Sequence, residues 1–560
     1  MKKIGKLLNR VWKDYYPKPD SLPRTRSFWI AFGIVALAVL AYVAYFCIFV
    51  TAKQDAFKTN AEDLGIMDQA IWNLLHGSML SQTICNVVSD TNCYGLNGIS
   101  RLAIHFEPAL FPISLLYLFW SDPKMLLIFQ VLVVASGAFP AFWLARLRLR
   151  NAWAAVPFAL LYLLYPAQQY AVNFDFHAVT LVIGLLLFAI YFLYVRKTFW
   201  FFVFAILCLT CKEEIAGVIF MLGLWALLLQ RRWGLGLTVM GMSVAYTILG
   251  LLVVHLVSPV GHSLLASRYS YLGSTPVQIV LSIVAHPLTM LKQHVLEASH
   301  RLYLRNLLAP AGYLPLLAPW VLALAAPTLA LNLLSSTPNM YSGDFQYNAE
   351  IVPVLIFASI EATVLIVWAV RKFIESLNVE PKSGETVERS GVVPAWKRTA
   401  SLSRMVQVGT LALVLCFMLV RVYNSSTQYN VYSVMPYAHG FVWPRATPHT
   451  RLATHFIKEI PPSASVSTQT ALVPHLSHRK QIYLFPYAIN HADYILLDAT
   501  GYTYPFKTYA SYASTVKTLL QSGNYGVLDM DDGYLLLEQG YPNTDINAAL
   551  KMIDDDAHDD

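Results

Sequence analysis

Long apolar runs without charge constrain the fold of this chain more than any other feature. Residues 28–50 are 23 consecutive positions with no charged side chain, and a helix of about 20 apolar residues crosses the hydrocarbon core of a bilayer. Similar runs recur as far as residue 420, so we expect an all-α polytopic membrane bundle of about eleven spans. Besides 28–50, spans are predicted at 125–145, 152–172, 178–195, 198–211, 215–229, 235–257, 307–334 (two helices kinked by proline), 351–370 and 405–420.

Composition supports this class. Hydrophobic residues make up 56% of the chain and charged residues 13%, whereas a water-soluble domain carries about 25% charge. The net charge of +7 does not indicate a nucleic-acid partner, because the basic residues form short clusters between apolar runs, as the positive-inside rule expects. We therefore expect a multi-pass protein of the cell (plasma) membrane.

The basic clusters also predict the orientation. Residues 1–27 hold seven lysines and arginines and should be cytoplasmic. Residues 51–107 then form a first outer loop, 258–306 a second outer loop and 371–404 a cytoplasmic loop. Residues 28–422 make up the transmembrane domain.

The composition changes from about residue 423. Short apolar stretches at 466–468, 482–485, 494–498, 526–528 and 534–537 are typical of strands, and 451–459 and 511–522 of helices. We expect a small α/β domain at 423–548, outside the cell because the number of spans is odd. The last residues, 549–560, should form an acidic, disordered tail.

Two short apolar runs, 198–211 and 215–229, are separated by Lys212, Glu213 and Glu214. Fourteen helical residues span only about 21 Å of a core roughly 30 Å thick. We predict a hairpin whose charged tip lies below the outer surface, where Glu213 and Glu214 could bind sugar hydroxyls or a divalent ion.

The first outer loop carries Glu62, Asp63 and Asp68 among apolar residues. Acidic side chains beside a membrane are costly unless water, a partner or a substrate meets them. We interpret Asp63 as a general base that precedes an amphipathic helix lying on the membrane surface, with Glu62 and Asp68 binding substrate. The alternative is that Asp63 is a helix N-cap.

Two acid–imidazole pairs, His105/Glu107 and Asp175/His177, are each spaced by two residues. Residues two apart share a face in extended backbone, so each pair could hold a substrate hydroxyl or a metal ion. The alternative is a hydrogen-bonded pair that stiffens a loop. Without a recognised metal motif, a divalent metal ion remains a candidate cofactor, with Asp63, Glu107 and His177 as candidate ligands.

Other polar residues are predicted on the same side. Lys212, Arg301 and Arg305 could bind a phosphate or extend to lipid headgroups. Gln346 and Tyr347 could line the same vestibule or cap a loop. Cys85 and Cys93 share a polar outer loop, where a disulfide is expected if the loop is extracytoplasmic.

Several motifs occur in a characteristic order: EDLGIMDQAIWN, HFEPALFPISLLY, NFDFHAV, KEEIAG and the Gln-Tyr before a late span. Together with IPPSASVSTQTALVPHLSHRKQIYLFP and DYILLD, they resemble the DUF2079 family of predicted membrane proteins over most of residues 50–540. That family is grouped with the GT-C membrane glycosyltransferases.

The resemblance implies transfer of a sugar from a polyprenyl-phosphate carrier to an acceptor on the outer face. Asp63 would act as base or orient the acceptor. The residues that match the family's polar motifs are Glu107, Asp175, His177, Glu213 and Glu214.

Our hypothesis is therefore a GT-C-type glycosyltransferase whose partners are the bilayer, a polyprenyl-phosphate-linked sugar and an envelope glycan, lipid or protein acceptor. The alternatives are a transporter or flippase using intramembrane carboxylates and a non-catalytic membrane scaffold. The enzyme hypothesis requires Asp63, Glu107, Asp175, His177 and Glu213 to converge on one outward cavity.

Overall fold

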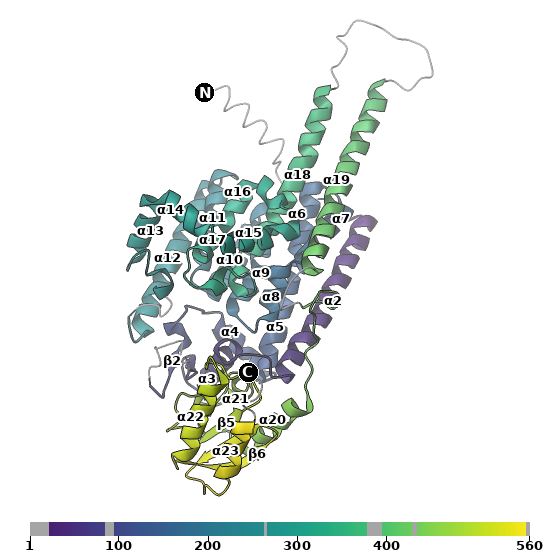
Figure 1. The fold of residues 1–560 in the computed structure, drawn as a ribbon. Coiled ribbons are helices and arrows are strands. Elements are labelled where there is room, and N and C mark those ends of the chain that lie inside the picture. Colours follow the sequence, from purple (N-terminus) through teal and green to yellow (C-terminus); the bar gives the residue numbers. More distant parts are fainter. Residues whose placement is uncertain (1–21, 85–94, 262–265, 378–394, 428–433, 556–560) are drawn as a thin grey trace, which may run out of the picture.

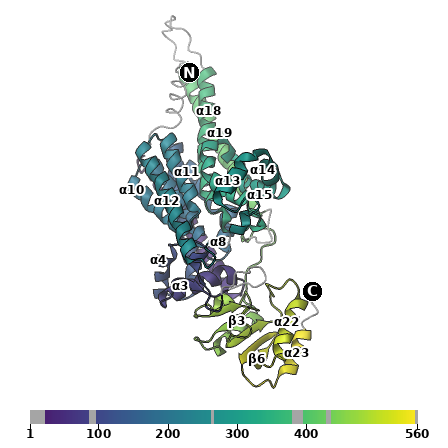
Figure 2. The same cartoon turned by 90° about the vertical axis from the view of Figure 1, so that its left-hand side faces the viewer.

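The computed structural model describes residues 22–84, 95–261, 266–377, 395–427 and 434–555. It consists of a helical bundle and a small C-terminal domain with a mixed sheet (Figure 1). The C-terminal domain lies at the end of the bundle where the first long helix, α2 (Arg26–Asp55), ends. Figure 2 gives the same arrangement from the side.

Within the described residues, five helices are long and apolar enough to cross a membrane. They are Arg26–Asp55, Pro123–Leu149, Trp233–Val257, Gln346–Ser376 and Arg404–Ser425. Five shorter apolar helices accompany them: Ala152–Leu163, Ala178–Tyr194, Thr198–Cys211, Ile215–Leu228 and Pro319–Leu333. The multi-helix bundle is thus confirmed, while the count of eleven spans and their orientation stay predictions.

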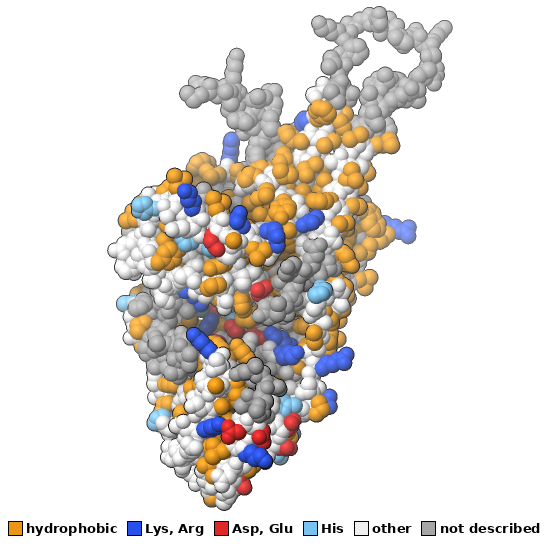
Figure 3. Space-filling view, in the orientation of Figure 1, with side chains coloured by type: hydrophobic (Ala, Val, Ile, Leu, Met, Phe, Trp, Pro, Cys, Tyr) orange, Lys and Arg blue, Asp and Glu red, His pale blue; other side chains and the backbone are white. Residues whose placement is uncertain are grey.

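The apolar surface is distributed as lipid contact requires. Only 17% of the apolar window of Arg404–Ser425 is buried inside the protein, against 72% for Gln346–Ser376. Figure 3 shows hydrophobic side chains spread over α18 (Ile351–Leu377) and α19 (Ala395–Thr427). The exposed helices carry apolar side chains that only lipid or another apolar partner would shield from water.

The bundle is assembled from short and long helices in chain order. The remaining elements are η1 (Ala61–Gly65), α3 (Ile66–Leu75), β1 (Ser81–Gln82), β2 (Ile99–Ser100), η2 (Arg101–Ala103), α4 (Leu110–Ser114), η3 (Leu115–Leu118), α5 (Pro123–Ser136), α6 (Ala138–Leu149), α7 (Ala152–Leu163), α8 (Pro166–Asn173), η4 (Ala178–Leu181), α9 (Val182–Tyr194), α10 (Thr198–Cys211), α11 (Ile215–Leu228), α12 (Trp233–Val257), η5 (Ala266–Tyr269), α13 (Pro276–Ala285), α14 (Pro287–His294), α15 (Ala298–Leu308), η6 (Ala309–Ala311), η7 (Leu314–Leu317), α16 (Pro319–Leu322), η8 (Ala323–Ala325), α17 (Ala326–Leu333), η9 (Pro338–Tyr341) and η10 (Gln346–Asn348).

The predicted hairpin is present as α10 and α11. The Arg232 guanidinium, just after α11, donates a hydrogen bond of 2.7 Å to the Thr198 hydroxyl at the start of α10. The far ends of the two helices therefore lie together, opposite the charged tip. Helix α11 then packs closely on α12, where a Cβ on Gly236 would lie 2.8 Å from the Gly223 carbonyl oxygen, as small residues allow.

Four predicted segments differ from the structure. Residues 258–306 contain α13, α14 and α15, and both views place α13 and α14 beside the bundle and away from the C-terminal domain. Residues 307–334 form a series of one- and two-turn helices, because four prolines interrupt backbone hydrogen bonding.

The other two differences lie at predicted loop and tail boundaries. Helix α18 continues to Leu377 and α19 begins at Ala395, so both enter the predicted loop 371–404. The predicted disordered tail at 549–560 is helical as far as Asp555, in α23 (Ile546–Asp555). Ala549 and Ile553 on this helix are buried in the C-terminal domain, and that contact stabilises it.

The C-terminal domain has a five-stranded sheet in the order β4-β3-β5-β7-β6. Strands β3, β4 and β5 are parallel, whereas β7 is antiparallel to β5 and β6. Helices α20 and α21 cover one face, and α22 and α23 cover the other. The bounds are α20 (Pro448–Glu459), β3 (Val466–Thr468), α21 (Val473–Leu476), β4 (Ile482–Leu484), β5 (Tyr494–Asp498), α22 (Tyr509–Gln521), β6 (Tyr525–Asp531) and β7 (Tyr534–Gln539).

The first predicted outer loop packs against this domain. Ala61, Ile66 and Ile84 belong to the same buried apolar cluster as α20 and α21, and the Ala61 N–H donates to the Thr470 hydroxyl at 3.1 Å. The apolar side of α3 was predicted to lie on the membrane surface, but protein buries it instead. This contact fixes the position of η1.

Candidate functional site

Asp63 lies within the single π-helical turn η1, next to Glu62. Its Oδ1 is 3.2 Å from Nε2 of His177, which is 7% exposed. The residue that precedes η1 is Asn60 and the one that precedes α3 is Gly65, so Asp63 caps neither helix. The N-cap interpretation is therefore wrong, and the carboxylate is left to interact with His177.

Asp175 lies beside this pair and is fully buried. It accepts hydrogen bonds of 2.8 Å from Lys53 Nζ and from the Asn60 N–H. Burial raises the pKa of Asp175, while the Lys53 ammonium opposes that shift. We call Lys53, Asp63, Asp175 and His177 the Asp63 cluster.

Gln130 of α5 fixes the backbone of this cluster. Its Nε2 donates to the Asp175 carbonyl at 2.8 Å, and its Oε1 accepts the His177 N–H at 3.0 Å. Asp175 has a φ of +51°, in the left-handed region, which costs energy for a residue other than glycine. The turn thereby directs Asp175 toward Lys53 and His177 toward Asp63.

A second set of charges lies around the tip of the α10–α11 hairpin. His105 Nδ1 is 2.8 Å from Glu213 Oε1, and the Phe106 N–H donates to Glu213 Oε2 at 2.9 Å. Burial opposes ionisation of Glu213, but attraction to His105 outweighs it and lowers the pKa of Glu213 to about 2. Lys212 Nζ lies 2.9 Å from Glu214.

Glu107 completes this second set. The Arg101 guanidinium donates to both of its carboxylate oxygens, at 2.8 and 3.3 Å. The Glu107 carboxyl is buried, yet the Arg101 charge keeps its pKa below the usual range. We call this set the Glu213 cluster; its members are Arg101, His105, Glu107, Lys212, Glu213 and Glu214.

The two acid–imidazole pairs do not act as pairs. His105 contacts Glu213 while Glu107 contacts Arg101, and His177 contacts Asp63 while Asp175 is bound by Lys53. The shared-face prediction is wrong, because neither stretch is a regular strand. Each imidazole pairs with an acid from a distant segment.

The predicted convergence thus occurs in two parts. Asp63, Asp175 and His177 come together, and Glu107 and Glu213 belong to the other cluster. Aromatic rings connect the two regions: Phe174 stacks on His177 and meets Phe345 edge-on at 4.5 Å. Phe345 in turn contacts Tyr347, whose hydroxyl is close enough to influence Lys212 electrostatically.

Two cavities adjoin the Asp63 cluster and share Tyr170 and Asp344 in their walls. The first, here the arginine cavity, has a volume of about 440 Å³ and is lined by Arg305 and Arg421. The second, here the lysine cavity, has a volume of about 500 Å³. Its wall includes Lys53, Lys58, Asn60, Asn173 and Phe174.

These cavities lie near the junction of the bundle and the C-terminal domain, since Tyr502 of that domain also lines the lysine cavity. Figure 3 shows charged side chains gathered in a hollow at this junction. Of the predicted cations, Arg305 lines a cavity, whereas Arg301 is exposed on α15 and Lys212 is in the Glu213 cluster. Sequence reasoning missed Arg421, although a basic residue directly after the run 405–420 was a signal for it.

Three further predicted residues have contacts within the protein. Glu62 accepts a hydrogen bond of 2.7 Å from the Tyr504 hydroxyl. Gln346 is 8% exposed, and its Oε1 has no hydrogen-bond partner within the described residues. Tyr347 accepts at its carbonyl from Asn332, at 2.8 Å.

Asp68 is completely buried and is therefore poorly placed to bind substrate. It accepts hydrogen bonds from the hydroxyls of Tyr117 and Ser477 and lies 3.1 Å from His478 Nε2. Burial disfavours the imidazolium, but Asp68 outweighs this and raises the pKa of His478. Asp68 thus joins the bundle to the C-terminal domain.

The predicted metal ligands do not form one set, because Glu107 is in a different cluster from Asp63 and His177. Among the described residues, the group close enough to share an ion is His455, Glu459 and Asp529, in the C-terminal domain. Cys85 and Cys93 lie outside the described residues.

Comparison with solved structures gives matches to ArnT from Cupriavidus metallidurans. The form bound to undecaprenyl phosphate is 13% identical, with a TM-score of 0.49, and the match covers 92% of this chain and 98% of that one. The apo form is 12% identical, with a TM-score of 0.46 and coverage of 90% and 98%. At these values the likeness establishes neither a common fold nor a common activity.

No curated protein matches the chain. The model of the family described as "Predicted membrane protein (DUF2079)" matches residues 53–536. This range includes both clusters, both cavities' charged residues and most of the C-terminal sheet. The chain is therefore a multi-pass membrane protein that belongs to the DUF2079 family.

Proposed function

We propose that the protein transfers a sugar from a polyprenyl-phosphate carrier to an acceptor on the extracytoplasmic face of the membrane. The observation that carries the proposal is the Asp63–His177 pair beside two connected, cation-lined cavities. Asn60 and Phe174, in the wall of the lysine cavity, stand three residues before Asp63 and His177 respectively.

The arginine cavity suits the carrier. Arg305 and Arg421 supply guanidinium groups, which bind phosphate oxygens through two hydrogen bonds at once. Apolar residues such as Pro166, Leu307 and Pro310 line the same space, and α19 beside it is largely uncovered by protein. A prenyl chain could thus lie along the bundle while its phosphate enters the cavity.

The reaction itself needs a base and a stabilised leaving group. The acceptor hydroxyl oxygen attacks the anomeric carbon, a new carbon–oxygen bond forms, and the bond from that carbon to the phosphate oxygen breaks. Asp63 takes the acceptor proton, or orients the hydroxyl, with His177 fixing the carboxylate. Arg305 and Arg421 stabilise the negative charge on the departing polyprenyl phosphate.

The Glu213 cluster contributes differently under this proposal. Lys212 and Glu214 pair with each other, as do Glu107 and Arg101 and Glu213 and His105. These ion pairs fix the hairpin tip and the segment around Phe106 next to the aromatic rings that lead to His177. We assign them a positioning role rather than direct contact with the sugar.

The test is transfer by the purified full-length protein. Polyprenyl phosphates carrying radiolabelled hexoses or pentoses are incubated with the protein and cell-envelope extract. We expect label to move from the carrier into an envelope acceptor, and an Asp63→Asn variant that purifies normally should transfer none above background. Absence of transfer by the unmodified protein from every carrier would count against the proposal.

A further inference from the structure

A second polar site lies on the C-terminal domain, at the exposed side of α20. His455 and Glu459 are four residues apart on this helix and therefore share a face. Asp529 reaches the same place from strand β6. Nε2 of His455 is 3.0 Å from Asp529 Oδ2 and 3.4 Å from Glu459 Oε1.

These separations match those between ligands of one small metal ion. An ion about 2.1 Å from each ligand atom places neighbouring ligands about 3.0 Å apart at octahedral angles and about 3.4 Å apart at tetrahedral angles. The three ligand atoms all lie within 4.8 Å of one another. One ion can thus reach all three with small side-chain adjustments.

A break in the sheet places Asp529 on this side. The register of β6 against β7 shifts between Val527 and Asp529, as in a β-bulge, which redirects side chains. Leu528 packs on the α20 side, while Val527 and Met530 pack on the opposite side. Asp529 therefore faces α20 together with Leu528, although strict alternation would direct it away.

The carboxylate of Asp529 is also held in orientation. Its Oδ1 accepts the Met530 N–H at 2.8 Å, which leaves Oδ2 toward His455. The site is open, since the His455 side chain is 58% exposed. Ligands that are fixed by the backbone yet reachable from water suit an ion taken from solution.

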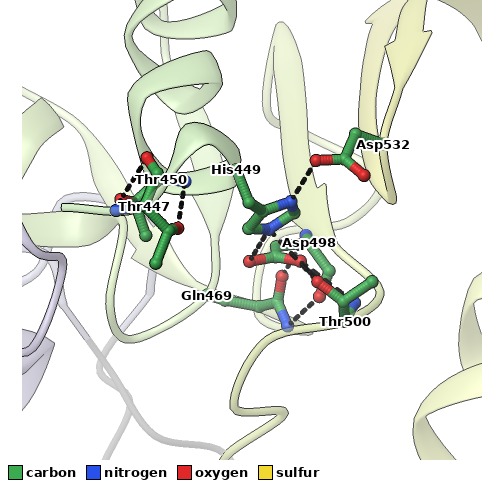
Figure 4. A network of polar contacts seen from close by, with 7 residues as sticks. All are labelled: Thr447, His449, Thr450, Gln469, Asp498, Thr500 and Asp532. Carbon is green, nitrogen blue, oxygen red and sulfur yellow. Dashed lines mark hydrogen bonds and ion pairs between the residues drawn. The ribbon is translucent and has the colours of Figure 1, made fainter.

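A second histidine in the same domain shows the contrast. His449 also contacts two carboxylates, but through different ring nitrogens: Nδ1 lies 2.9 Å from Asp532 and Nε2 lies 3.1 Å from Asp498 (Figure 4). A single ion cannot reach both carboxylates and one nitrogen there. That arrangement holds an imidazolium, and its two acidic partners raise the pKa of His449 against the effect of burial.

We infer that His455, Glu459 and Asp529 form a binding site for one divalent transition-metal ion of the Zn²⁺ type. One imidazole nitrogen and two carboxylate oxygens suit such an ion, and water would fill the remaining positions. The ion would connect α20 to β6 on the surface of the C-terminal domain. This site is independent of the sugar-transfer proposal, because none of its residues lines either cavity.

The experiment is a Zn²⁺ titration of the full-length, metal-stripped protein in detergent, followed by calorimetry. We expect a binding event that His455→Ala weakens at least tenfold and that Glu459→Gln and Asp529→Asn also weaken. Lys458→Ala, on the same helix, and His449→Ala, in the other histidine network, are the matched controls and should bind as the unmodified protein does.

Thermal unfolding gives a second readout. A ligand that binds only the folded state raises the unfolding temperature, so Zn²⁺ should stabilise the unmodified protein and the Lys458→Ala variant more than His455→Ala. Equal binding by His455→Ala and the unmodified protein would overturn the inference, and so would the absence of Zn²⁺ binding by the unmodified protein.

Discussion

Asp63 and His177, which belong to different predicted outer segments, meet through Oδ1 and Nε2 at 3.2 Å. The contact is set by two separate devices. The C-terminal domain holds η1 through the Ala61–Thr470 hydrogen bond, while Gln130 holds the backbone on either side of Phe176. An acid and an imidazole so placed can share a proton with a hydroxyl group that enters from the lysine cavity.

The role of His177 can be separated from that of Asp63. Replacing His177 by Gln removes the imidazole but keeps a side-chain donor near Asp63. We expect transfer to fall about 10- to 100-fold, less than the loss of about 10²- to 10⁴-fold expected for removing a general base. Rates measured over a range of pH should show that the variant has lost one ionisation. An unchanged rate and pH profile would contradict the assignment.

The arginine cavity makes a prediction about carrier binding. Arg421→Gln should weaken the binding of polyprenyl phosphate at least tenfold, because one of the two guanidinium groups in the cavity is lost. Arg301→Gln is the matched control, since Arg301 lies on the same helix as Arg305 but lines neither cavity. Binding to protein in detergent can be followed by tryptophan fluorescence; equal affinities of the two variants would be evidence against the cavity.

Asp68 should be required for docking of the C-terminal domain rather than for catalysis. Asp68→Ala leaves the buried Tyr117 and Ser477 hydroxyls without their acceptor, at a cost of about 3 kcal/mol. We expect a lower unfolding temperature and faster proteolysis between the bundle and the C-terminal domain. Normal stability combined with lost carrier binding would instead support the original substrate-binding prediction for Asp68.

The His105–Glu213 pair predicts a pH dependence of stability. The folded-state pKa of Glu213 is about 2, below the value of about 4.3 for an unfolded glutamate. Its contribution is therefore fully present above about pH 4.3 and is lost as the pH falls through 2. Glu213→Gln should be less stable than the unmodified protein near pH 6, and the difference should shrink toward pH 2. A difference that stays constant over this range would refute the linkage.

A buried ion pair inside the bundle gives a stability test away from the site. Arg148 of α6 and Glu361 of α18 are in contact at 2.5 and 2.8 Å and almost fully buried. Arg148→Ala should destabilise the protein by about 3–5 kcal/mol, because it leaves the Glu361 charge unpaired, whereas Arg148→Met with Glu361→Met should be nearly neutral. Unfolding of the three proteins in detergent would compare them, and equal losses in both variants would contradict this account.

Periodicity and composition predicted much of the fold. The helices from 26 to 257 and the strands of the C-terminal sheet lie close to their predicted positions, because each apolar run is long or clearly bounded. Prolines made 307–334 unreliable, since they interrupt helices without fixing the direction of the chain afterwards. Helix α23 was missed because its contacts with the sheet, through Ala549 and Ile553, are invisible in a run of acidic residues.

The candidate site was predictable in residue type but not in pairing. Spacing placed His105 with Glu107 and Asp175 with His177, and tertiary structure exchanged those partners. The partners Lys53, Arg101 and Gln130 come from segments that sequence reasoning treated as span ends or loop. Arg421 and the shared cavity wall at Tyr170 and Asp344 required the three-dimensional packing of α8 and α19.

The most direct test compares two neighbouring carboxylates in one assay. Asp63→Asn and Glu62→Gln are each measured for sugar transfer from a radiolabelled polyprenyl-phosphate sugar, with unfolding temperature as the check on folding. We predict that Asp63→Asn loses at least 99% of the transfer rate while remaining folded and able to bind carrier. Glu62→Gln, whose partner is the Tyr504 hydroxyl, should keep most of it. Full transfer by folded Asp63→Asn would contradict the account.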